Sequence, residues 1–129
     1  MVKPDLTAQM IDAGRQLLEL LDRTTFRARA CFWLYFPESD RWRFVLASHE
    51  VRVRGPLAAY RKVQALARKV PEATEVFAPG AVTVLKDNDP LVVLLRKAMS
   101  TGPGISGIRV SNNSINGTFI DDAYIYRLT

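Results

Sequence analysis

The chain has 129 residues, of which 48% are hydrophobic and 24% charged, a composition typical of a folded globular domain rather than a disordered chain. A single cysteine excludes an intramolecular disulfide, and with a single histidine it leaves too few ligands for a Cys- or His-based zinc centre. We therefore predict one domain over residues 1–129 with no metal and no cofactor, although Asp and Asn oxygens could still hold a hard cation.

The net charge is +5, and the excess lies in one segment of the chain. Residues 51–70 hold six basic side chains and no acidic one, whereas residues 1–50 hold seven of each sign. The six are Arg52, Arg54, Arg61, Lys62, Arg68 and Lys69. Arg outnumbers Lys 13 to 5 and favours bidentate contacts to phosphate or carboxylate groups. The segment is therefore a candidate surface for a nucleic acid or a protein partner.

The N-terminal region has the pattern of a cytoplasmic protein. One Lys is followed by Asp5 and Asp12, and no long apolar run follows, so no secretory signal is predicted. No stretch approaches the 18 or so consecutive apolar residues that a membrane-spanning helix requires. The sequence therefore predicts a cytoplasmic location and no membrane contact.

Residues 5–23 are predicted to form an amphipathic helix, because apolar side chains recur there at spacings of three and four. Asp5 is the candidate N-cap of this helix. Gly14 weakens the middle of a helix by about 1 kcal/mol relative to Ala, which indicates a close approach by another backbone or a bend at that position.

The next two segments, residues 26–36 and 42–53, are predicted to form an antiparallel hairpin. Both alternate along the chain, and the turn formers of residues 37–41 lie between them. In the first segment Trp33 and Tyr35 fall on one side, opposite a row of apolar residues.

The chain then returns to helix, strand and helix. A helix is predicted over residues 56–70, with a proline in its first turn, and a short β-branched strand over residues 81–85. Asp89 is the expected N-cap of a third helix, Pro90 its first residue, and the glycines and proline of residues 101–104 end it.

Strands over residues 105–111 and 118–128 are predicted to close the chain as a second hairpin. The sequence SNNSING between them is the strongest turn signal present, because Asn116 and Gly117 tolerate positive φ. Ile115 within this loop is expected to fold back onto the core. Whether the hairpin presents a functional site is left open by the sequence.

The order of elements is α-β-β-α-β-α-β-β, which indicates a single α+β domain. We predict a mainly antiparallel sheet of about five strands with three helices, and expect the helices to cover one face of the sheet.

A sheet face without helices would expose an aromatic and basic surface. That face would carry Trp33 and Tyr35, with Arg27 and Arg29 on the same strand. Tyr, Trp and Arg are enriched at protein–protein hot spots. The sequence therefore favours a small non-enzymatic binding module that acts through a protein partner or by self-association into a homo-oligomer.

An alternative is nucleic-acid binding through residues 51–70 and the first hairpin. Aromatic side chains on strands can stack on bases while neighbouring Arg side chains contact phosphates. No ribonucleoprotein consensus, GxxG clamp or helix-turn-helix spacing accompanies this composition.

A second alternative is a small enzyme that uses Cys31 and His49, which lie near each other if the first hairpin is regular. The apolar neighbours of Cys31 favour an inert thiol instead. The acidic pair Asp121 and Asp122 draws attention too, but neighbouring strand residues point to opposite faces unless a bulge intervenes. One of the two could meet an Arg of residues 51–70.

Overall fold

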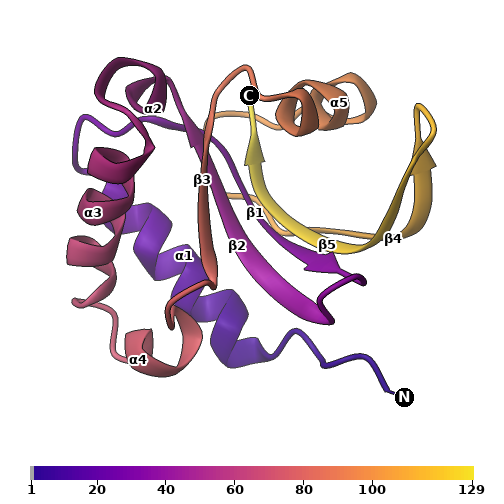
Figure 1. Cartoon of the computed structure of the whole chain (residues 1–129), viewed down its shortest axis with the longest axis horizontal. Coiled ribbons are helices and arrows are strands. Elements are labelled where there is room, and N and C mark those ends of the chain that lie inside the picture. Colours follow the sequence, from indigo (N-terminus) through magenta and orange to yellow (C-terminus); the bar gives the residue numbers. More distant parts are fainter. Residues whose placement is uncertain (1) are drawn as a thin grey trace.

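The structure, a computed structural model, describes residues 2–129, which form five helices and one five-stranded sheet (Figure 1). The helices are α1 (Ala8–Asp22), α2 (His49–Arg54), α3 (Pro56–Ala67), α4 (Ala73–Val76) and α5 (Pro90–Ala98). The strands are β1 (Ala28–Phe36), β2 (Arg41–Ser48), β3 (Val82–Lys86), β4 (Ile108–Ile115) and β5 (Thr118–Leu128). The predicted single α+β domain and its order of elements are confirmed, and the short helices α2 and α4 are added to them.

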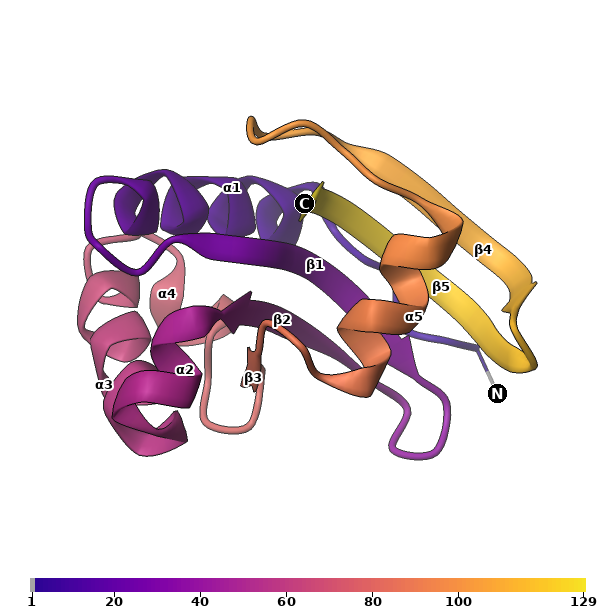
Figure 2. The ribbon, with the colours of Figure 1, turned by 90° about the horizontal axis from the view of Figure 1, so that it is seen from above.

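The strands lie side by side in the order β3-β2-β1-β5-β4. Strands β1 and β2 form the predicted first hairpin, β4 and β5 the second, and β1 also pairs antiparallel with β5. Only β3 runs parallel to its neighbour, β2, so the sheet is mixed but mainly antiparallel. The central position of β1 between β2 and β5 is visible in Figure 2.

Helices cover both faces of the sheet, so the expectation of a single covered face is wrong. One face packs with α1 and α3 through buried side chains that include Trp33, Phe44 and Tyr126. The other face lies beneath α5 (Figure 1). Its buried side chains include Phe32 and Val45. Strand β1 is therefore buried on both sides, as strands between two helical layers are.

The predicted strand over residues 42–53 is wrong beyond Ser48. Strand β2 ends there because the Ser48 Oγ accepts a hydrogen bond from the Glu50 backbone N–H at 3.1 Å and caps α2. The remaining residues of the predicted strand form that helix. Ser48 is a residue type that favours such caps, and this is the local signal for the helix.

The starts of helices α1 and α5 follow capping chemistry. The N-cap of α1 is Thr7 and not the predicted Asp5, because the Thr7 Oγ1 accepts from the Met10 N–H at 3.1 Å. The predicted cap of α5 is confirmed: the Asp89 carboxylate accepts from the Leu91 N–H at 2.9 Å, ahead of a proline at the first helical position.

The second hairpin has a shorter turn than the sequence SNNSING suggested. Residues 111–115 belong to β4, and the turn consists of Asn116 and Gly117, whose φ angles are 47° and 83°. Ile115 ends β4 and packs against the apolar cluster beneath α5, as expected. Within β4, Asn112 has a φ of 50°, and the regular pairing of β4 with β5 is interrupted there. The second hairpin curls up beside α5 (Figure 1).

Candidate functional site

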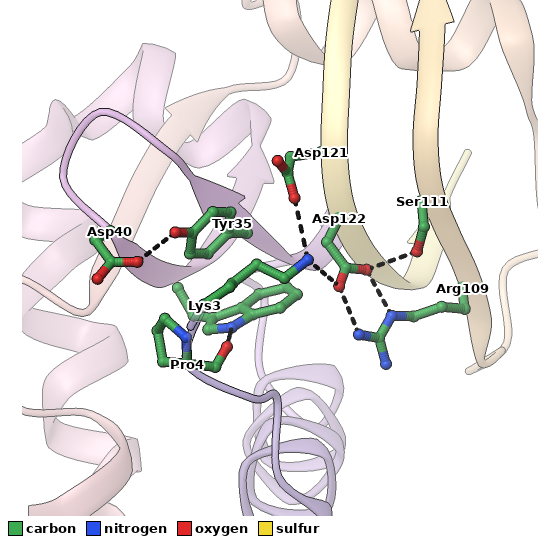
Figure 3. Close-up of polar contacts among 9 residues, drawn as sticks. Lys3, Pro4, Tyr35, Asp40, Arg109, Ser111, Asp121 and Asp122 are labelled. Atoms are coloured by element: carbon green, nitrogen blue, oxygen red, sulfur yellow. Dashed lines mark hydrogen bonds and ion pairs between the residues drawn. The ribbon is translucent and has the colours of Figure 1, made fainter. Parts of the chain in front are cut away.

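Side chains of the second hairpin and of the N-terminal segment form a group of polar contacts, here termed the Asp122 cluster: Lys3, Arg109, Ser111, Asp121 and Asp122 (Figure 3). Arg109 donates to the two carboxylate oxygens of Asp122 from Nε and Nη2, at 2.6 and 2.7 Å. The Ser111 Oγ donates to the same carboxylate at 2.9 Å. The Lys3 Nζ lies 3.0 Å from one oxygen of each aspartate.

Two neighbouring aspartates reach one lysine because β5 stops alternating between Ile120 and Ala123. The side chains of Ile120 and Ala123 both lie in the apolar cluster beneath α5, although strict alternation would turn residues three apart to opposite faces. The irregularity lies at the level of Asn112 in β4. Within the chain, an Arg of residues 51–70 is not the partner of this pair, because the cations come from β4 and from the N-terminus.

The charges of the cluster cancel, with two cations against two carboxylates. Hydrogen bonds from Arg109 above all, and then from Lys3 and Ser111, hold the pKa of Asp122 well below its usual range despite its burial. The hydrogen bond to Asp122, followed by that to Asp121, raises the pKa of Lys3. Groups shifted in these directions stay ionised near neutral pH, so neither suits general acid–base catalysis. The cluster instead joins the N-terminal segment to the second hairpin through ion pairs.

The cluster, together with Trp42, holds Lys3 and Pro4 against one end of the sheet (Figure 3). The Trp42 Nε1 donates to the carbonyl oxygen of Pro4 at 2.8 Å, and the Arg109 guanidinium lies 5.7 Å from the centre of the Trp42 ring. The Lys3 Nζ lies 5.2 Å from the centre of the Tyr35 ring. Cations and chain thus cover the aromatic side chains at this end of the sheet.

The predicted exposed aromatic face is therefore wrong. Trp33 is 1% exposed and Tyr35 7%. Trp33 donates from Nε1 to the Met10 carbonyl of α1 at 3.1 Å. Tyr35 donates to the carboxylate of Asp40, and this hydrogen bond raises the pKa of Tyr35 to about 12. The uninterrupted apolar run of residues 31–36 was the sequence signal for a strand covered on both faces.

The structure divides the six basic side chains of residues 51–70 into two groups. Three are paired: Arg52 lies 2.8 Å from Asp87, and Lys62 and Arg54 lie 3.0 and 3.6 Å from Glu50. Three are exposed and form no ion pair within residues 2–129. These three are Arg61, Arg68 and Lys69. Half of the predicted basic side chains are thus paired with carboxylates of the same chain.

Arg27 and Arg29 are exposed, but Trp33 and Tyr35, the aromatic side chains predicted to lie beside them, are buried. The Arg29 Nε donates to the Thr129 Oγ1 at 3.3 Å. Because Trp33 and Tyr35 are buried, the base-stacking half of the nucleic-acid surface is not formed. Of the candidate residues, the structure brings Arg68 and Lys69 together at one cavity, between α3 and α4.

The two residues of the enzyme alternative lie in different environments. Cys31 is fully buried on the sheet face beneath α1, and its burial raises the pKa of the thiol well above the usual value. The side chain of His49 is 62% exposed at the start of α2, with its Nδ1 4.0 Å from an oxygen of Asp87. A buried neutral thiol is a poor nucleophile. The structure forms no Cys–His pair.

The native protein is expected to be unreactive toward a thiol reagent such as 5,5′-dithiobis(2-nitrobenzoate) at neutral pH. Reaction requires both access and the thiolate, and Cys31 has neither. One thiol per chain should react once guanidinium unfolds the protein, which serves as the control. Release of the coloured product from the native protein at the rate of the unfolded one would contradict the assignment of Cys31 as structural.

Comparison with protein-family models, with curated proteins and with solved structures finds no match to this chain. Among residues 2–129, no three His, Cys, Asp or Glu side chains are grouped so that they could hold a metal ion. In the same part of the chain, no helix combines the length and apolar character needed to cross a membrane. Function therefore has to be inferred from the surfaces of the chain itself.

Proposed function

We propose that this protein is a small interaction module that self-associates through strand β4. Two copies would pair their β4 strands antiparallel about a two-fold axis, joining two five-stranded sheets into one. The observation that carries the proposal is the exposure of Ile108–Ile115 at the edge of the sheet, with no strand of residues 2–129 on its outer side. Unpaired backbone groups at such an edge are a template for another strand.

The two edges of the sheet differ in a way that supports a closed dimer. Strand β3, the other edge, has five residues and packs beside α2 and α3. Strand β4 has eight residues. Pairing of β4 with β4 uses the same surface on both copies and leaves no second long edge, so the assembly ends at two chains.

The charges along β4 also support pairing with an identical strand. Natural edges are often guarded by Lys, Pro or outward charges. The only charged side chain of β4 is Arg109, which Asp122 neutralises, and residues 110–115 are uncharged. Like charges directly opposite each other are destabilising in a sheet, and a two-fold pairing of this strand avoids them.

Sedimentation velocity over a range of about 5 to 500 μM protein is expected to show a monomer–dimer equilibrium. Because each copy carries a net charge of +5, added salt should strengthen the dimer, the opposite of its effect on nucleic-acid binding. Amide hydrogen exchange of β4 should slow as the dimer forms, while that of β3 should not change.

Ser114→Lys is expected to weaken the dimer several-fold, because it places an exposed guard charge on the edge of each copy. Ala65→Lys is the matched control, since it adds the same charge to an exposed position on α3. A monomer at every concentration would overturn the proposal, as would a dimer that both variants weaken equally. In the first case, the edge would have to serve a different protein.

A further inference from the structure

A cavity of about 370 Å³ lies between the end of α3 and the segment around α4, and is here termed the α3–α4 cavity. Its volume falls within the range of about 300 to 1,000 Å³ that small-molecule sites occupy. Phe77 forms part of its wall and is held rigidly, because its ring stacks on Trp33 and meets Phe44 edge-on. The cavity therefore has a fixed apolar wall.

The side chains that line the α3–α4 cavity offer hydrogen-bond donors, and the charged ones among them are both cations. Arg68 and Lys69 line it, and neither forms an ion pair within residues 2–129. Thr74 adds a hydroxyl group. Gln64 adds an amide whose Nε2 is buried without a hydrogen-bond partner. Buried donors are normally paired, so this amide lacks an acceptor that a ligand would supply.

No carboxylate lines the cavity to neutralise these donors. Glu72 and Glu75 belong to the same segment, but neither is a lining residue; the Glu72 Oε2 is buried without a hydrogen-bond partner among residues 2–129. Glu75 accepts instead from the Gln9 Nε2 at 3.2 Å. The charged side chains that line the cavity are thus both cations, and their complement is an anion.

We infer that the α3–α4 cavity binds a small organic phosphate. A phosphate monoester carries a charge of about −1.5 to −2 and three terminal acceptor oxygens. Two cations with two neutral donors suit that group better than a carboxylate, which offers two oxygens and one charge. Arg68 can bind it in bidentate fashion. The organic part would lie against the wall that contains Phe77. This inference is independent of strand β4.

The test is a titration of the ¹⁵N-labelled full chain with adenosine 5′-monophosphate, followed by two-dimensional NMR. Saturable shifts are expected for the Gln64 side-chain amide and the Thr74 backbone amide, and inorganic phosphate should compete. The double variant Arg68→Ala/Lys69→Ala should bind at least about tenfold more weakly, because two charge-assisted hydrogen bonds are lost. Both residues are exposed, so the variant should fold, as circular dichroism can verify.

Arg61→Ala is the matched control, because Arg61 is an exposed cation of α3 that forms no ion pair within residues 2–129 and does not line the cavity. It should leave binding unchanged, whereas Gln64→Leu should weaken it. Absence of saturable shifts would overturn the inference. So would an equal loss in Arg61→Ala and Arg68→Ala/Lys69→Ala, above all if a single-stranded oligonucleotide bound better than the monophosphate and with a steep salt dependence. That outcome would assign these cations to nucleic-acid phosphates on the surface of α3.

Discussion

Replacing Gly14 with alanine is expected to destabilise the protein by about 2 kcal/mol or more, although alanine favours a helix by about 1 kcal/mol. A Cβ atom at this position would lie 2.9 Å from both Phe44 Cε1 and Trp33 Nε1, and closer still to the Tyr126 hydroxyl. All three rings are buried, and Phe44 packs against each of the other two. Overpacking such a core costs about 3 kcal/mol, which exceeds the gain in helix propensity.

Urea denaturation at neutral pH measures this effect as a lower midpoint with an unchanged slope. Gly102→Ala is the matched control, because an added Cβ there meets no heavy atom within 4 Å and its φ is not positive. Its free energy of unfolding should stay within about 0.5 kcal/mol of the original. A Gly14→Ala variant as stable as the control would contradict the close packing of α1 on the sheet.

Gly14 also illustrates how far local sequence patterns extend. The sequence indicates a close approach or a bend at this residue, because glycine is costly within a helix. It suggests another backbone, whereas the structure places three aromatic side chains there. Two of these come from β1 and β2 and the third from β5, near the other end of the chain. Helix propensity is local, but the identity of the neighbours depends on the order of the strands.

The same limit explains the error about the sheet faces. The caps at Asp89 and Pro90 and the turn at Asn116 and Gly117 follow from the chemistry of adjacent residues, and these predictions hold. The exposure of Trp33 does not depend on adjacent residues. It depends on whether helices pack on one side of the sheet or on both, and tertiary packing decides that.

The contacts of the Asp122 cluster are even harder to predict from local sequence patterns. The acidic pair stood out in the sequence because acidic residues disfavour strands. Its Lys3 partner is 118 residues from Asp121 and 119 from Asp122 along the chain. No periodicity relates such positions. The acidic pair could therefore be singled out from the sequence, but its ion pairs with the N-terminal segment could not.

Asp122→Asn is expected to destabilise the protein by about 2–3 kcal/mol at pH 7, because it removes a buried carboxylate that accepts from three side chains. This loss of stability is expected to be smaller than the largest losses known for broken buried ion pairs. The side chains of Lys3 and Arg109 are 37% and 47% exposed, so water can solvate them in the variant. Urea midpoints of the original and the variant measure the difference.

The effect should depend on pH with a definite sign. The folded pKa of Asp122 lies below the unfolded value of about 3.9, so its contribution is complete above about pH 5 and is lost as the pH falls toward the folded pKa. The difference between the two proteins should therefore shrink progressively below about pH 5. Asp121→Asn is the matched control: this side chain is 27% exposed and contacts Lys3 alone in the cluster, so its replacement should cost less than about 1 kcal/mol. A difference for Asp122→Asn that stays constant down to about pH 3, or an equal loss in both variants, would show that the carboxylate of Asp122 does not hold the N-terminal residues to the sheet.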